Sequence, residues 1–387
     1  RGYYIHADLD MDGFPAPTYA LADTAEVSIL DQYVGYAGVN LALLDGKLTN
    51  RAAVTWMRND RDYYSARGAN PDYGYTGTNV RFEYEGVYSP VDQAKLVFGY
   101  EHERPDYTFY DAFSSGSYKI NIDSVYALAI VKPFVGLAVT GGVRHDDHSQ
   151  FGGATTVGAN ANYSPNNGAT NIRVSYGEGF KAPSLFQLYS DYGNAALRPE
   201  RSKSYDIGFD QSLDGGRAIL SVTAFRRDTT DQINYDASLP PFGRYNNIDR
   251  TRAKGVEASI ALKPVDALTV TGSYSYVDAR DRSGGITDGN RLPRRAANAI
   301  SVSSDYVWSF GLSTGATVTM VGDSFDNAAN TRRLDGYALV GLRASLPLGE
   351  HLEVYGRIDN LFDEAYATAY GYGVYGRSAF GGVRVRF

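Results

Sequence analysis

The first stretch whose residues could do chemistry runs from Asp8 to Gly13 and carries carboxylates at every second position. Asp8, Asp10 and Asp12 offer the oxygen ligands that a hard cation such as calcium prefers, and Gly13 permits a sharp bend after them. A solvated acidic loop that binds no metal has the same pattern. The run therefore predicts either a calcium site or a charged loop.

A second candidate is the His-Asp-Asp-His run at 145–148. It could be a metal site, but its place at a strand-to-loop corner favours a hydrogen-bonded turn. We recognise no Ser or Thr nucleophile beside a base, and the Gly-rich pieces at 177–179 and 371–373 do not open helices as phosphate-binding loops do. The sequence therefore predicts no enzyme.

The composition of the 387-residue chain is β-rich and turn-rich, with 32 Tyr and 42 Gly. The net charge of -7 argues against nucleic-acid binding, which needs a basic face. Cys is absent, so thiol and disulfide chemistry is excluded. No apolar run approaches the roughly 18 residues of a membrane helix, so the chain could cross a membrane only as a closed barrel.

The elements that must position these residues are strands, because about eighteen segments alternate apolar and polar side chains. Along 268–276, for example, Leu268, Val270, Tyr274 and Tyr276 share one face, and Thr and Ser residues share the other. One apolar and one polar face in so many successive strands predict an all-β fold, an antiparallel transmembrane β-barrel with lipid outside and water inside.

The connections between these segments alternate between short and long, which gives the barrel an orientation. Outer-membrane barrels have short periplasmic turns and long outer loops. A soluble β-propeller is the alternative, but no fixed repeat supports it. The short turns are 44–46, 89–92, 132–134, 164–168, 213–216, 263–266, 308–309 and 347–350. The long segments are 9–24, 60–76, 104–117, 145–153, 180–201, 229–250, 279–293, 323–335 and 364–376.

The final strand ends on the short-turn side. Val383, Val385 and Phe387 are predicted to face lipid, and Arg384 and Arg386 the lumen. In a complete barrel this strand would pair with the first one.

The beginning of the chain predicts a partial barrel. Residue 1 already lies within a strand-like segment, the first strand at 2–6 is short, and no signal peptide is recognised. We therefore expect one domain over residues 1–387, forming the C-terminal part of a longer precursor.

Three motifs suggest a family: Gly-Phe-Lys-Ala-Pro at 179–183, Leu-x-Pro-Glu-x-Ser at 197–202, and Asn-Leu-Phe-Asp-x-x-Tyr at 360–366, before a closing Phe387. In these the chain resembles the TonB-dependent outer-membrane receptors. Within that family the likeness is greatest to the vitamin B12 (cobalamin) transporters. Five stretches carry it: 146–152, 180–202, 252–258 with 276–280, 292–296, and 366–372 with 376–377.

The resemblance implies sites on the outer loops. The vitamin B12 transporters bind calcium through an Asp-x-Asp-Gly-Phe segment, which Asp10 to Phe14 match, and through acids of the next loop, for which Asp62 and Asp72 are the candidates. A corrinoid would be bound by large rings and hydrogen-bond donors. The candidate ligand residues are Arg294 and Tyr372, from the family pattern, and Tyr63, Tyr64, Tyr189 and Tyr192, from the outer loops.

The resemblance also implies a function, the active uptake of vitamin B12 or a related corrinoid across the outer membrane of a Gram-negative bacterium. The expected receptor has about 22 strands, an N-terminal plug domain and a segment that contacts the TonB energy-coupling protein. By this comparison, the plug and the first strands lie outside the chain. The alternatives are a receptor of the same family for an iron chelate, which would favour a basic mouth, and a diffusion porin without a plug.

Overall fold

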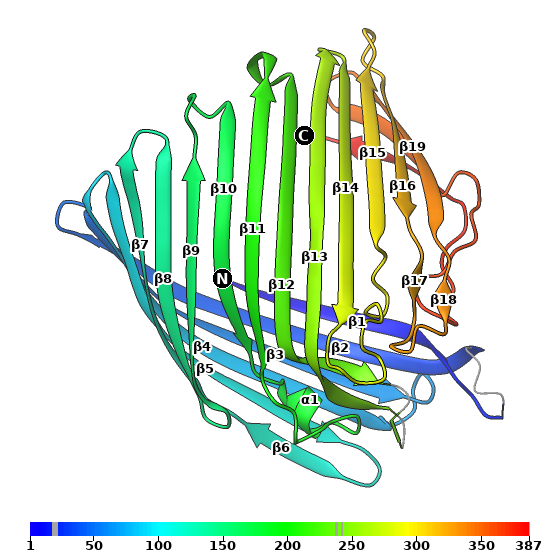
Figure 1. Ribbon diagram of the computed structural model, residues 1–387. Helices are drawn as coiled ribbons and strands as arrows, with labels where there is room; N and C mark the ends of the chain where they lie inside the picture. The colour runs from blue at the N-terminus through cyan, green and yellow to red at the C-terminus, as the bar shows by residue number, and fades with distance from the viewer. Residues whose placement is uncertain (18–21, 237–238, 241–242, 387) are drawn as a thin grey trace.

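The computed structural model describes residues 1–17, 22–236, 239–240 and 243–386. Within them the chain forms an antiparallel meander that wraps around a hollow (Figure 1). The strands are β1 (Gly2–Gly13), β2 (Ala22–Leu43), β3 (Leu48–Tyr64), β4 (Tyr73–Val91), β5 (Ala94–Tyr110), β6 (Ser115–Lys119), β7 (Ile122–Phe134), β8 (Leu137–His148), β9 (Gly152–Tyr163), β10 (Thr170–Lys181), β11 (Glu200–Leu213), β12 (Ala218–Asp236), β13 (Arg244–Val265), β14 (Leu268–Asp281), β15 (Asn298–Val307), β16 (Ser313–Val321), β17 (Ser324–Phe325), β18 (Arg333–Leu334), β19 (Tyr337–Leu348), β20 (Leu352–Asp359) and β21 (Ser378–Val385).

The predicted number of strands is confirmed in the described part of the chain. The main sheet has 19 strands, and β17 and β18 form a separate pair. Because β6 and β7 both pair with β5 and together make one interrupted strand, eighteen strands build the wall. The all-β antiparallel fold is confirmed as well. Among the described residues, no helix is both long and apolar enough to cross a membrane.

The outer face of the wall is apolar. Across β13 and β14, Val256 lies opposite Tyr276 and Ala258 opposite Tyr274, so the alternation in each strand aligns with that of its neighbour. Large apolar side chains of this face have no protein packed over them, and Ile207 on β11 is 57% exposed. Since a water-facing sheet would bury such residues, this face is suited to lipid.

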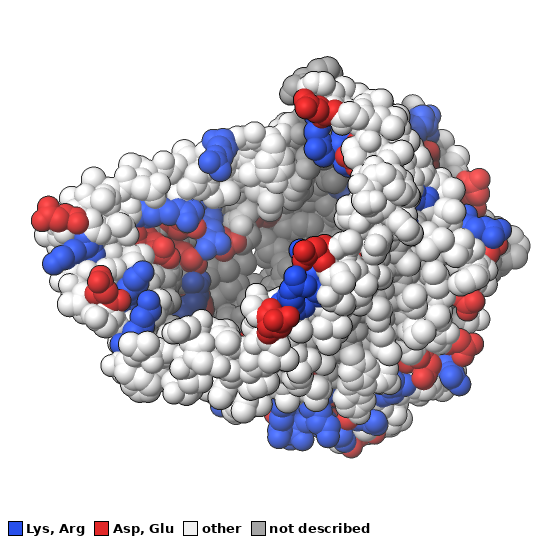
Figure 2. Space-filling view, turned by 90° about the horizontal axis from the view of Figure 1, so that it is seen from above, with Lys and Arg blue, Asp and Glu red and all other residues white. Residues whose placement is uncertain are grey.

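The inner face is charged and held by ion pairs. The Arg144 guanidinium donates to Glu101 Oε2 at 2.7 Å and to Asp146 Oδ1 at 2.8 Å, and Arg173 Nε donates to Asp210 Oδ2 at 2.8 Å. The view in Figure 2 shows the hollow that this wall surrounds, with charged side chains along its inner side.

The last strand has the predicted orientation. Arg384 lies opposite Glu353 of β20 and donates to its Oε2 at 2.8 Å on the inner face. Val383 and Val385 lie on the other face and are 59% and 52% exposed. Phe387, which was also predicted to face lipid, lies outside the described residues.

The predicted bounds of several long loops are wrong, because the strands continue beyond the apolar band. The segment 60–76 is reduced to a loop at 65–72, since β3 runs to Tyr64 and β4 begins at Tyr73. Likewise β12 continues to Asp236 and β13 begins at Arg244. Here the outer face is polar, as at Asp60 and Asp62 on β3, so the apolar alternation ends, while the backbone hydrogen bonds between strands continue.

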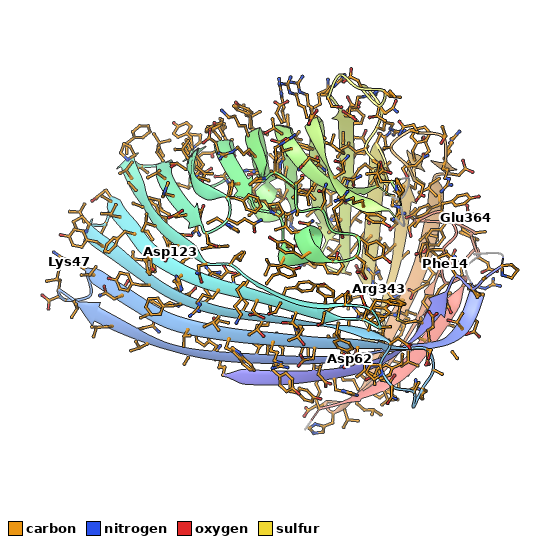
Figure 3. The ribbon with its side chains drawn as sticks, turned by 90° about the horizontal axis from the view of Figure 1, so that it is seen from below. Phe14, Lys47, Asp62, Asp123, Arg343 and Glu364 are labelled. Atoms are coloured by element: carbon orange, nitrogen blue, oxygen red, sulfur yellow. The ribbon has the colours of Figure 1, made fainter. Side chains whose placement is uncertain are left out.

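The first strand is also longer than predicted. β1 extends to Gly13 and pairs with β2 along most of its length, with an irregularity between Asp10 and Asp12. The Asp8 to Gly13 run is therefore strand and not loop. Among the described residues no pairing joins β1 to β21. Instead, Phe14 after β1 makes an edge contact with Tyr372, at 6.1 Å between ring centroids. Figure 3 shows Phe14 on the same side of the molecule as Glu364, which belongs to the same loop as Tyr372.

The wall also opens between β9 and β10. β9 pairs with β10 through residues 158–163 and 172–177, and the two strands then diverge toward the long-loop end. The Glu178 carboxylate accepts a hydrogen bond from the Val157 N–H across the opening, at 3.3 Å. A cavity of about 710 Å³ lies at this opening.

Candidate ligand-binding site

A short helix covers part of the hollow at the long-loop end. α1 (Leu185–Tyr189) follows a capping box, in which Ser184 Oγ accepts from the Gln187 N–H and Gln187 Oε1 accepts from the Ser184 N–H. Leu185 is buried against Tyr107 of β5. The cap and this contact hold α1 against the inner wall, with its aromatic residues toward β4 and β5.

Aromatic rings from three elements build one wall. Tyr75 of β4 stacks on Tyr107 of β5 at 6.0 Å between centroids, and Phe186 of α1 contacts both rings edge-on, at 5.6 Å and 6.0 Å. Tyr63 of β3 stacks on Tyr73, directly opposite it on β4, at 4.4 Å. Flat rings at these spacings offer stacking surface to a large planar ligand.

These rings line a cavity of about 1300 Å³. It is larger than the roughly 300–1000 Å³ of pockets for drug-sized ligands, so a bulky solute would be needed to fill it. The lining residues are Leu30, Asn59, Arg61, Tyr63, Asp72, Tyr73, Tyr75, Gly77, Tyr107, Asp111, Ala112, Phe113, Phe186, Asp191 and Tyr192.

The charges around the cavity are mostly negative. Asp111 accepts hydrogen bonds from the backbone N–H groups of Phe113 and Ser114, each at 2.6 Å, and these bonds lower the pKa of the Asp111 carboxyl. Among the described residues that line the cavity, Arg61 is the one cation, and its Nε donates to Ser28 Oγ at 2.9 Å. Three carboxylates against one guanidinium make the lining acidic.

The match of most of the sequence to one family model identifies the family of this chain. Residues 3–361 match the family model described as TonB dependent receptor-like, beta-barrel. The chain belongs to this family. Its barrels lie in the outer membrane of Gram-negative bacteria, so the predicted localisation is confirmed. The family is one of receptors and not of enzymes, as predicted, and it favours a receptor over a diffusion porin.

Solved structures of receptors share the fold. A variant of the ferric enterobactin receptor PfeA of Pseudomonas aeruginosa has a TM-score of 0.78 at 17% identity, over 94% of this chain and 62% of that one. The copper transporter OprC has a TM-score of 0.79 at 14% identity, over 95% and 69%. The ferric-catecholate import receptor Fiu of E. coli has a TM-score of 0.76 at 17% identity, over 96% and 66%. This chain thus spans 62% of the enterobactin receptor's length.

Three of the predicted ligand residues of this receptor barrel lie in the aromatic region. Tyr63 and Tyr192 line the cavity. Tyr189 on α1 stacks face to face on Tyr118 at 3.8 Å, beside the cavity. Tyr64 follows Tyr63 on β3 and therefore has its side chain on the opposite, outer face, away from the cavity.

Arg294 and Tyr372 are on other loops and do not line the cavity. The backbone of Arg294 has a positive φ of 57°, and its Nε donates to Asp326 Oδ1 at 2.8 Å, so its guanidinium joins two loops. Tyr372 is 52% exposed and contacts Phe14. Ligand contact by any of the six residues stays a prediction.

The five predicted calcium ligands are not brought together. Asp8 accepts from Arg67 Nη1, and Asp10 accepts from Arg67 Nη2 at 2.7 Å. Asp62 accepts from the Tyr110 hydroxyl at 2.7 Å, and Asp72 lines the cavity. Asp12 lies beyond the irregularity in β1. Among the described residues no group of three or more His, Asp or Glu is arranged to hold a metal ion.

The favoured interpretation of the histidine run at 145–148 as a turn is wrong, because these residues are the last of β8 and pair with β7 and β9; the turn begins directly after them. His148 is buried, and its Nδ1 accepts from the Gln150 N–H at 3.1 Å. His145 forms a hydrogen bond with Thr155 instead, at 2.8 Å.

The sequence contains one Gly-x-Ser-x-Gly motif, at 311–315, but Ser313 opens β16 after a short turn. A nucleophile elbow requires a turn from strand to helix, so this serine is not one.

Sequence reasoning missed most of the aromatic wall, namely Tyr73, Tyr75, Tyr107 and Phe186. A signal was present, because Tyr73 and Tyr75 are spaced by two, as are Tyr107 and Phe109, and therefore share a face within each strand. That they meet Tyr63 depends on the register between strands, which the sequence alone does not show.

Proposed function

We propose that this chain forms the ligand-capturing barrel of an active outer-membrane importer whose solute is vitamin B12 or another corrinoid. The observation that carries the proposal is the large, aromatic and acidic cavity at the long-loop end. A corrin ring is flat and broad and would stack on Tyr63, Tyr73 and Tyr75. The acidic lining suits a solute that is neutral or cationic at its periphery.

The partners are proposed from the family. A plug inside the barrel would complete the ligand site, and the TonB energy-coupling protein would pull on that plug. No bond is made or broken in this process. The barrel supplies capture and a path, and the energy comes from outside the chain.

The second candidate function is uptake of an iron chelate. It is favoured by the fold shared with receptors named for ferric enterobactin and ferric catecholates. A ferric tris-catecholate is trianionic, however, and Asp72, Asp111 and Asp191 would repel it.

Binding of the two solutes to the natural full-length protein tests this proposal. We expect cyanocobalamin to bind in isothermal titration calorimetry, with an affinity that changes less than threefold between 50 and 500 mM salt, because its contacts are mainly apolar. A ferric tris-catecholate should not compete with it. Binding of the catecholate with no binding of cyanocobalamin would exclude the corrinoid and support the chelate.

Calcium binding by the acids of β1 and the following loops is also proposed. Arg67 now neutralises Asp8 and Asp10, so a calcium ion would have to displace its guanidinium. Hydrogen bonds to these two carboxylates raise the pKa of Arg67, so it stays charged and competes at any physiological pH.

The Arg67→Ala variant should therefore bind calcium about tenfold more tightly than the natural protein, because the competing cation is gone. Calorimetric titration with calcium chloride measures this. Arg104→Ala, which removes an exposed arginine of β5, is the control and should leave calcium affinity unchanged. The calcium site is refuted if neither protein binds calcium, or if Asp10→Ala combined with Asp12→Ala has no effect on binding.

A further inference from the structure

One sector of the outer wall differs in charge from the rest of the molecule. Five cationic side chains and one carboxylate, from β12, β13, β14 and the residue directly after β14, line a small hollow of about 120 Å³. The lining residues are Arg226, Arg252, Lys254, Asp278, Arg280 and Arg282. We call this group the basic patch.

Strand register places the patch on the lipid-facing side. Arg226 lies opposite Lys254, and Lys254 opposite Asp278, in one row across the three strands. The next row contains Asp228, Arg252 and Arg280. Because side chains alternate, these residues share the face of Val256 and Tyr276, the outer one.

The patch begins where the apolar band ends. On β14 the outer face is apolar or aromatic from Leu268 to Tyr276, a stretch of nine residues, and the next outward residues are Asp278 and Arg280. A tilted strand crosses the hydrocarbon core in about 9–11 residues. The band starts at the short-turn end, so the patch lies at the level of the outer-leaflet headgroups, just beyond the tyrosines.

Two of the five cations are available to an external anion. Arg226 and Arg252 share Asp228, at 2.8 Å and 2.6 Å, and Arg280 donates to Asp278 at 2.6 Å. Lys254 and Arg282 are exposed, and in the described part of the chain neither has a carboxylate within ion-pairing distance. The patch thus keeps unneutralised positive charge in a chain whose net charge is -7.

The outer face of β1 to β8, at the same distance beyond the apolar band, does not share this excess of positive charge. Among the described residues from β1 to β8, the outward-facing charged side chains beyond the apolar band are mostly acidic. The acids are Asp8, Asp10, Asp31, Asp60, Asp62, Asp106, Asp123 and Asp147, and the cations are Arg58, Arg67, Arg104 and Lys119. Positive charge is therefore concentrated over β12 to β14.

We propose that the basic patch binds the phosphorylated headgroup of an outer-leaflet glycolipid. The apolar band directly below it must contact the acyl chains of that leaflet, so a lipid seated on the band brings its headgroup to the patch. Guanidinium groups hold phosphate oxygens by paired, charge-assisted hydrogen bonds, and the hollow between them accepts the anion.

The test compares two double variants of the natural full-length protein, purified in dodecyl maltoside. Lys254→Gln with Arg282→Gln removes the two unpaired cations and leaves no carboxylate without its partner. Lys119→Gln with Arg104→Gln removes one Lys and one Arg from the outer face of the acidic sector and is the matched control. Heat-modifiable migration on gels establishes that both variants fold.

Native mass spectrometry measures binding of diphosphoryl lipid A and of the same lipid without its phosphates. Each cation at a charged membrane surface contributes roughly fivefold, so we expect about thirtyfold weaker binding of diphosphoryl lipid A by the patch variant. The control should change less than twofold, and the dephosphorylated lipid should bind the natural protein and the patch variant alike.

Three outcomes would overturn the proposal. Equal loss in both double variants would show a general charge effect. Unchanged binding of diphosphoryl lipid A by the patch variant would mean that the basic patch does not contribute to lipid binding. Displacement of the lipid by an equal concentration of inorganic pyrophosphate would mean that the patch takes free phosphate and not a lipid headgroup.

Discussion

Replacing Tyr63 with Ala is expected to weaken cyanocobalamin binding by the natural full-length protein about thirtyfold, or about 2 kcal/mol. Tyr63 lines the cavity, stacks on Tyr73 at 4.4 Å and lies under the Arg61 guanidinium at 5.3 Å. Its removal takes away stacking surface and one of the contacts that order Tyr73 and Arg61. Calorimetry measures the change.

Tyr64→Ala is the matched control, because the two residues are adjacent on β3 and face opposite sides of the wall. We expect a change of less than twofold for Tyr64→Ala. Similar losses of affinity in the two variants would mean that the substitutions disturb the structure of β3 and do not remove a ligand contact. Unchanged affinity in Tyr63→Ala would mean that the ligand binds elsewhere.

Replacing Gly193 with Ala is expected to lower ligand affinity at least tenfold by displacing the loop after α1. A Cβ at Gly193 would lie 2.6 Å from the Ser190 carbonyl oxygen and 2.7 Å from backbone atoms of Leu188. Backbone cannot rotate away as a side chain does, so the loop must move. That loop carries Tyr192 into the cavity, and it is anchored by the Asn194 N–H bond to the Gln187 carbonyl at 2.9 Å.

Gly285→Ala provides the control, because this loop glycine has an ordinary φ and its nearest neighbour would be Ser283 Oγ at 3.9 Å. We expect it to bind ligand normally. Gel migration after heating should be the same for both variants, since the barrel wall is untouched. Normal affinity in Gly193→Ala would show that the position of Tyr192 does not matter for binding.

The strand pattern was predictable because it is local. Each strand must turn one face to lipid, so apolar residues recur at every second position whatever the neighbouring strand does. The same local logic oriented the last strand, where Arg384 meets Glu353 on the inner face. The eighteen strands, the family and the place of the long loops were all readable from residues alone.

The loop bounds were not predictable, because the local signal ends where lipid ends. Beyond the apolar band the outer face is polar as well, as at Asp60 and Asp62 on β3, so the alternation of apolar and polar faces is lost. Whether such a segment is strand or loop then depends on backbone hydrogen bonds to its neighbour, and these continue to Tyr63 opposite Tyr73. The acids of β1 were assigned to a loop for this reason.

By itself the sequence determined a membrane β-barrel, since lipid imposes a periodicity that each strand carries within itself, and its motifs resemble those of the TonB-dependent receptors. The tertiary structure alone decided which side chains meet. It stacked Tyr63 on Tyr73, brought Phe186 onto Tyr75 and Tyr107, and set Arg67 between Asp8 and Asp10. Those contacts depend on strand register and loop return, which join residues far apart in the chain and leave no periodic trace in it.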